Sequence, residues 1–114
     1  MAVVDTFRAL GDPVRLKIVQ RLRPARPCTI SSVSRGLGMT RQGARRHLQV
    51  LADARLVALE PRGRDVLVHL QPQHLEQARA FIAELEHRWD TRLEALKAFV
   101  EENNVAGEDD TSSR

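Results

Sequence analysis

The segment over residues 38–57, GMTRQGARRHLQVLADARLV, constrains the fold more than any other part of this 114-residue chain. Thr40 can cap a helix that runs to about Ala54. Three apolar residues recur at i, i+4 and i+7 on this helix and share one face, which we expect to be buried: Ala44, Leu48 and Leu51. Polar and basic residues occupy the other faces: Arg41, Gln42, Arg45, Arg46 and Gln49. The helix is therefore expected to pack with one side and to offer a basic side to a partner.

A shorter helix is expected just before this basic one. Thr29 can cap it, it would run from Ile30 to Leu37, and Gly38 would end it. Two short helices joined across the sequence LGMT form a helix-turn-helix arrangement, in which the second helix can enter the major groove of DNA.

The rest of the chain predicts a mainly α fold with a small β-hairpin. A first helix spans Val3–Leu10, and a second begins at Pro13 with Asp12 as its cap. Strand-like runs at residues 56–60 and 65–70 flank the turn sequence PRGR. A long helix then runs from residue 71 to about 103. We expect one domain over residues 1–103 and a disordered acidic tail over residues 104–114.

Charge is distributed unevenly along the chain. Residues 1–70 hold 13 Lys and Arg against 5 Asp and Glu, a balance of +8, whereas residues 71–114 hold 5 against 10, a balance of −5. No acidic residue lies between Asp12 and Asp53, and arginine supplies 16 of the 18 basic side chains. The guanidinium group suits phosphate oxygens and guanine edges, so the pattern favours a polyanionic partner such as DNA. The alternative is a basic face that only contacts solvent.

Several classes of function find no support in the sequence. No apolar run is long enough for a membrane span, and the N-terminus lacks the apolar centre of a secretion signal, so we expect a cytoplasmic protein. Cys28 is the only cysteine, which excludes an internal disulfide. No nucleophile motif and no glycine-rich phosphate loop is present, so we expect neither an enzyme nor a cofactor.

The long last helix carries an apolar stripe that a domain of this size cannot cover. Roughly 30 helical residues span about 45 Å, so part of the stripe is expected to meet another chain. We predict a homodimer held by residues of the first and last helices: Val3, Phe7, Leu10, Leu85, Trp89, Leu93 and Leu96.

Three strings resemble the winged helix-turn-helix regulators of the ArsR family. FRALGDPVRLKIVQRL is similar to that family's opening, LGMTRQGARRHLQVLADARLV to its helix-turn-helix, and GRDVLVHL to its wing. The likeness covers residues 5–100 and implies four helices, a two-stranded wing and a long last helix. It also implies a sequence-specific, homodimeric DNA-binding regulator, most often a repressor, that acts on an operator. The alternative is a winged helix that binds an acidic protein surface instead.

The resemblance also assigns the DNA-contacting residues. It places Thr40, Arg41, Gln42, Arg45 and Arg46 on the recognition helix, which also bears Gln49, and it places Arg62 and Arg64 on the wing. His47 is expected to pack half-buried beneath the recognition helix. Gly43 stands where the family has alanine, and we expect it to permit close approach to the preceding helix.

The family's metal-sensing motif is missing from this chain. Its two cysteines fall at Thr29 and Ser31, and Cys28 is one position out of register, where a buried structural thiol is expected. A second metal site of the family uses the last helix, where His74, Glu84 and His87 are candidates but do not reproduce its spacing. We therefore predict no bound metal, and the effector that releases DNA stays open.

Overall fold

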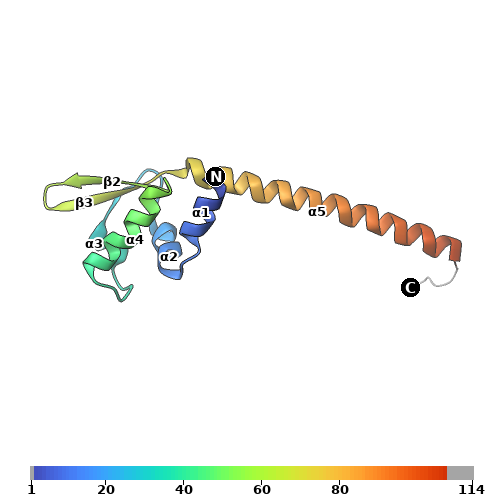
Figure 1. Ribbon diagram of the computed structural model, residues 1–114, viewed down its shortest axis with the longest axis horizontal. Helices are drawn as coiled ribbons and strands as arrows, with labels where there is room; N and C mark the ends of the chain where they lie inside the picture. Colours follow the sequence, from blue (N-terminus) through green and yellow to red (C-terminus); the bar gives the residue numbers. More distant parts are fainter. Residues whose placement is uncertain (1, 108–114) are drawn as a thin grey trace. The chain divides into compact units, whose positions relative to one another are not determined.

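The computed structural model describes residues 2–107 of the chain. It contains two units, Met1–Arg79 and Ala80–Arg114. The first unit holds four helices, three strands and the start of a fifth helix, in the order α1-α2-β1-α3-α4-β2-β3-α5 (Figure 1). The mainly α class with a β-hairpin is therefore confirmed.

Helices α1 and α2 form where their sequences predict them. Helix α1 spans Ala2–Leu10 and α2 spans Pro13–Arg21. The Asp12 carboxylate accepts hydrogen bonds from the backbone N–H groups of Val14, at 2.9 Å, and Arg15, at 3.0 Å. These bonds satisfy two donors that the first turn of a helix otherwise leaves unpaired, which confirms Asp12 as the cap of α2.

Helix α3 begins as expected but ends early. It spans Ile30–Ser34, and the Thr29 hydroxyl caps it by accepting the N–H of Ser32 at 3.1 Å. The expected continuation to Leu37 is wrong. Gly36 has a φ of +77°, a left-handed conformation that stops a helix and that glycine adopts without steric cost.

Helix α4 spans Arg41–Asp53, as its capping and apolar pattern predict. The Thr40 hydroxyl accepts the backbone N–H of Gly43 at 2.9 Å. A Cβ added at Gly43 would lie 3.3 Å from this hydroxyl oxygen, and its other close neighbour would be Met39. Gly43 therefore makes room for the cap of its own helix, and the expected approach to the preceding helix is wrong.

A three-stranded antiparallel sheet completes the first unit. Strand β2 spans Val57–Arg62 and β3 spans Asp65–Leu70, which confirms the predicted hairpin, and Gly63 turns it with a φ of +62°. The predicted order lacked a third strand, β1, at Cys28–Thr29, which pairs with β3 on the side away from β2. Cys28 lies opposite Val68 in this pairing.

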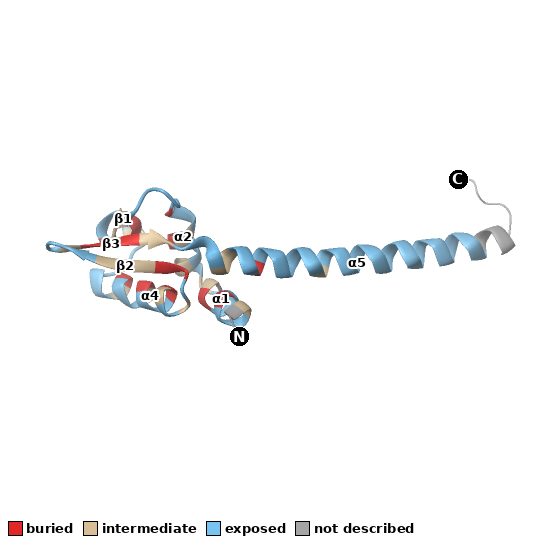
Figure 2. Cartoon of the chain, turned by 90° about the horizontal axis from the view of Figure 1, so that it is seen from above, coloured by how far each residue is buried: buried red, intermediate tan, exposed pale blue. Residues whose placement is uncertain are grey.

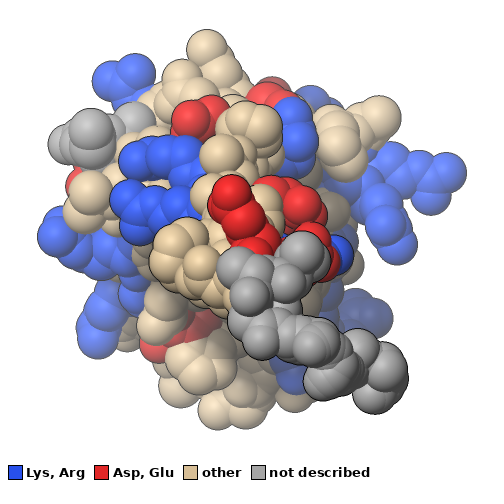
Figure 3. All heavy atoms as spheres, turned by 90° about the vertical axis from the view of Figure 1, so that its right-hand side faces the viewer, with Lys and Arg blue, Asp and Glu red and all other residues tan. Residues whose placement is uncertain are grey.

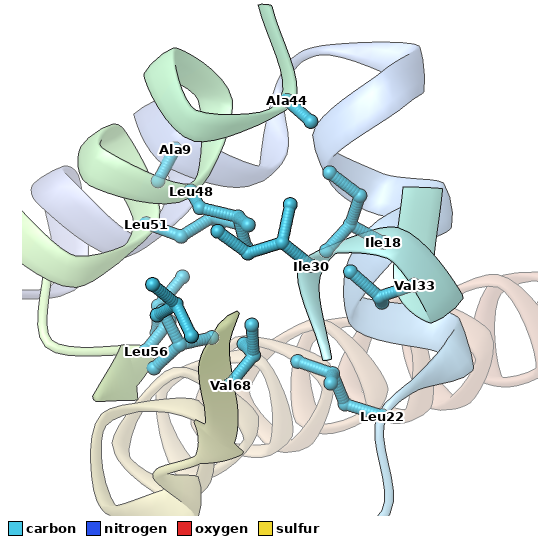
Figure 4. Packing of buried hydrophobic residues seen from close by; sticks show 12 residues of the cluster. Ala9, Ile18, Leu22, Ile30, Val33, Ala44, Leu48, Leu51, Leu56 and Val68 are labelled. Atoms are coloured by element: carbon cyan, nitrogen blue, oxygen red, sulfur yellow. The ribbon is translucent and has the colours of Figure 1, made fainter. Parts of the chain in front are cut away.

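The apolar core joins the helices to the sheet (Figure 4). The buried face of α4 lies at its centre, because Ala44, Leu48 and Leu51 have no exposed surface. The remaining core residues come from α1, α2, α3, β2, β3 and the residues next to them: Ala9, Ile18, Leu22, Ile30, Val33, Leu56, Val57, Val66 and Val68. This packing fixes which face of α4 remains outside.

Helix α5 spans Pro72–Gly107. It extends four residues past its expected end, so residues 104–107, predicted to belong to a disordered tail, are helical. The rest of the predicted tail lies outside the described residues. From Phe81 onward the large apolar side chains of α5 are mostly exposed (Figure 2). No helix within the described part of the chain is both long and apolar enough to cross a membrane.

Candidate nucleic-acid interface

The outer side of α4 presents the polar residues that the sequence predicts. Arg41, Gln42, Arg45, Arg46 and Gln49 are all exposed, opposite the three residues buried in the core. Basic side chains are not confined to α4: Lys and Arg groups appear at several places on the face drawn in Figure 3. A rigid helix with arginine and glutamine on its free side can donate hydrogen bonds to phosphates and to base edges.

The Thr40 hydroxyl is the cap of α4, so its oxygen is already engaged with the helix backbone. The N–H groups of Arg41 and Gln42 precede the first intrahelical bond, which joins the Ala44 N–H to the Thr40 carbonyl. Free N–H groups at a helix start attract phosphate oxygens. Thr40 therefore contributes to a DNA interface by fixing where α4 begins.

The Arg41 guanidinium bridges three elements. It lies 3.4 Å from a carboxylate oxygen of Asp65 on β3 and 3.4 Å from the hydroxyl of Ser31 on α3. The sequence predicts Arg41 as a DNA contact, but it predicts no role for Asp65. The one signal for Asp65 is that it is an acidic residue next to the turn of a basic hairpin.

The two wing arginines differ in their surroundings. Arg62 lies 3.4 Å from Glu60, which also hydrogen-bonds His69 at 2.7 Å. The bond from His69, followed by the one from Arg62, holds the pKa of the Glu60 carboxyl below its ordinary value. Arg64 is exposed beside the turn at Gly63, and no ion pair within residues 2–107 engages it. Arg64 is therefore the more available cation of the wing.

Gln49 lies further along α4 and is already engaged. Its side-chain amide donates to a carboxylate oxygen of Asp53, one turn later, at 3.0 Å. By contrast, the described residues provide no ion pair or hydrogen bond to the side chains of Arg45 and Arg46. Of the predicted contacts on α4, the side chains of Gln42, Arg45 and Arg46 are the ones without a partner among the described residues.

The candidate metal ligands are not gathered into one site. Residues 2–107 contain no group of three or more His, Cys, Asp or Glu side chains placed to hold a metal ion. Nδ1 of His74 is buried and has no hydrogen-bond partner in that range. Thr29 uses its hydroxyl to cap α3, and Cys28 is half-buried in β1.

The residues predicted to form a dimer interface divide into two sets. On α1, Phe7 is exposed whereas Val3 and Leu10 are half-buried. On α5, Trp89, Leu93 and Leu96 are 56%, 61% and 58% exposed, and Leu85 is half-buried. We call the four α5 residues the α5 stripe. Three of its large apolar side chains are thus exposed at helical spacing.

A helix-turn-helix followed by a β-hairpin defines a winged helix-turn-helix protein, and α3, α4, β2 and β3 supply those parts. Residues 10–60 match the family model described as a helix-turn-helix domain. A solved structure described as a possible transcriptional regulator for arsenical resistance is 30% identical, with a TM-score of 0.65. The alignment covers 82% of this chain and 94% of that one.

Two further relatives agree with this match. An ArsR-like transcriptional regulator from Rhodococcus sp. RHA1 is 26% identical, with a TM-score of 0.70, over 86% of this chain and 92% of that one. The HTH-type transcriptional repressor SmtB of Mycobacterium tuberculosis is 36% identical over 74 residues, 65% of this chain. The chain spans about half the length of that curated relative, 54%. The chain belongs to the ArsR family of helix-turn-helix regulators, whose members are named as regulators and not as enzymes.

Proposed function

We propose that this protein is a sequence-specific DNA-binding transcriptional regulator. The observation that carries the proposal is the geometry of α4, whose one face is fully buried in the core while its other face presents arginine and glutamine side chains. Base edges would be contacted from the first turns of α4, chiefly by Gln42 and Arg45, and phosphates by Arg46, Arg62 and Arg64. We also propose that the protein acts in the cytoplasm, where its bacterial relatives meet DNA.

The direction of regulation is proposed to be repression. The Mycobacterium tuberculosis relative is named a transcriptional repressor, and a protein that occupies promoter DNA blocks access to it without needing a further activity. The effector that ends repression is not assigned, since the thiolate ligands of the metal-sensing motif are replaced by Thr29 and Ser31.

The active form is proposed to be a homodimer. The α5 stripe exposes three large apolar side chains at helical spacing, and Phe7 of α1 is exposed as well. Paired in a twofold dimer, two copies of α4 would lie about one turn of DNA apart, roughly 34 Å. A palindromic or nearly palindromic operator follows from that symmetry.

Selection of duplexes from a random pool, followed by footprinting on the selected sequence, tests this function. We expect one preferred sequence with two related half-sites, bound at least a hundredfold more tightly than random duplex, on the order of the specificity that regulators show. Equal affinity for all duplexes would contradict the proposal and would favour a winged helix that binds an acidic protein surface. A single half-site sufficient for full affinity would contradict the palindromic operator alone.

A further inference from the structure

A polar cluster joins three helices beneath the recognition helix. Nε of Arg15, on α2, donates to the backbone carbonyl of Ala9 on α1 at 2.7 Å. Its Nη1 lies 3.3 Å from Nδ1 of His47 on α4. The backbone N–H of Arg15 donates to the Asp12 carboxylate, which lies 3.9 Å from the same ring nitrogen. We call Arg15 and His47 the α2–α4 clasp.

The chemistry of the clasp fixes the state of the histidine ring. A guanidinium can only donate, so Nδ1 of His47 must accept and its proton is carried by Nε2. Nδ1 then has no hydrogen for Asp12, and the distance of 3.9 Å to that carboxylate is too long for a hydrogen bond. Asp12 thus acts on α2 as its cap, while the direct link to α4 runs through Arg15.

This link is directional, unlike the apolar contacts of the core face of α4. The core residues there are apolar, and apolar packing opposes separation of helices more strongly than a small rotation of one of them. A hydrogen bond constrains distance and angle together. Since Arg15 is also held by the Ala9 carbonyl, the clasp ties the rotation of α4 to both α1 and α2.

Rotation of α4 matters because His47 and Arg45 lie on different sides of it. Two residues along an α-helix correspond to about 200° around its axis. A side-chain tip lies about 5–6 Å from the axis, so a 1 Å shift of His47 turns the helix by roughly 10° and moves Arg45 by a similar distance. Readout of base edges requires side chains to be placed within about 0.5 Å.

We propose that Arg15 and His47 are positioning residues that determine how well α4 discriminates between DNA sequences, without contacting DNA themselves. The inference rests on the proposed function. Both side chains are half-buried, and their polar atoms contact each other and the Ala9 carbonyl. Losing the clasp should reduce the contacts to bases, which need accurate placement, more than the contacts to phosphates, which tolerate small displacements.

Three variants of the clasp separate positioning from simple stability. His47→Phe keeps a ring of similar size but has no acceptor. His47→Asn keeps an acceptor, because its Oδ1 is attached to Cγ as Nδ1 is in histidine. Arg15→Gln removes the long donor and one charge, and Lys17→Gln, on the exposed side of the same helix, removes one charge without touching the clasp.

The experiment measures affinity for the selected duplex and for a random duplex, with circular dichroism to confirm folding. His47→Phe and Arg15→Gln should each lower the ratio of the two affinities about tenfold, the loss of one base contact. His47→Asn and Lys17→Gln should keep that ratio within about threefold of the wild type. If His47→Phe does not fold, Arg15→Gln compared with Lys17→Gln gives the same test.

The outcomes distinguish the clasp from the proposed function. A wild-type chain that prefers no duplex refutes the proposed function, and the positioning role fails with it. A wild-type chain with a clear preference, whose affinity ratio is unchanged in folded His47→Phe and Arg15→Gln, refutes the positioning role alone. A ratio that falls equally in Lys17→Gln and Arg15→Gln also refutes it, since charge loss would then be the cause.

Discussion

Replacing Trp89 by alanine tests the proposed dimer at the middle of the α5 stripe. Trp89 has 56% of its surface exposed. A tryptophan presents about 150–250 Å² in all, so roughly 80–140 Å² is free to be covered by a second copy. At about 25 cal/mol per Å², that burial contributes about 2 to 3.5 kcal/mol per protomer. A symmetric dimer contains the contact twice.

Alanine retains the Cβ and part of this contact, so we expect Trp89→Ala to weaken dimerisation by about 4 kcal/mol, or roughly a thousandfold in the dissociation constant. Sedimentation equilibrium over a range of concentrations measures that constant. The matched control is Thr91→Ala, because position 91 lies about 160° around the helix from Trp89. A wild-type chain that is monomeric at micromolar concentration would refute the reasoning, as would a Trp89→Ala dimer as tight as the wild type.

Three further outcomes are expected. Thr40→Ala should lower the free energy of unfolding by about 1 kcal/mol in urea denaturation, because the cap bond to Gly43 is lost. Thr40→Ser keeps the hydroxyl and should not lower it. Equal stabilities of the two variants would contradict the role of Thr40 as the cap. The bond from the Arg15 backbone N–H holds the pKa of Asp12 below its ordinary value of 3.8. The Asp12 carboxylate therefore stabilises the fold above about pH 4. This stabilisation is lost as the pH falls through the lowered pKa. Asp12→Asn should therefore reduce the loss of stability on acidification, measured by denaturation between about pH 2 and 6, and an unchanged profile would contradict the assignment. Zn²⁺, Cd²⁺ and trivalent arsenic should not release DNA through α3, because Thr29 offers no thiolate; stoichiometric metal binding that Cys28→Ser abolishes would show the opposite.

The parts of the fold that the sequence predicts are those with local signals. Asp12 and Thr40 predict where α2 and α4 begin, because a capping side chain bonds the backbone two or three residues away. The short strand β1 has no such signal. Two residues carry no periodicity, and Cys28 becomes part of a strand only because it pairs with Val68, 40 positions later. The sequence does not distinguish the early end of α3 from a later one, because Gly36 and Gly38 both suit a left-handed residue.

The candidate interface divides in the same way. Which residues face outward from α4 follows from helical periodicity, so the exposure of Arg45 and Arg46 was predictable. Their engagement with other elements was not. The contact between Arg41 and Asp65 spans 24 positions and that between Arg15 and His47 spans 32, and both depend on how the elements pack. Because its guanidinium also contacts Asp65, Arg41 is less available to contact bases than its position on α4 alone indicates.

Paired salt titrations test most directly whether α4 discriminates between bases while the wing supplies affinity. Arg45 has no partner in the described part of the chain, and Arg64 lies beside the turn of the wing. Arg45→Ala should cost about 1 to 3 kcal/mol on the selected duplex and less on random duplex. Arg64→Ala should weaken both duplexes alike and reduce the salt dependence by about one counterion. If Arg45→Ala weakens both duplexes equally and leaves their affinity ratio unchanged, α4 is not the reader of the sequence.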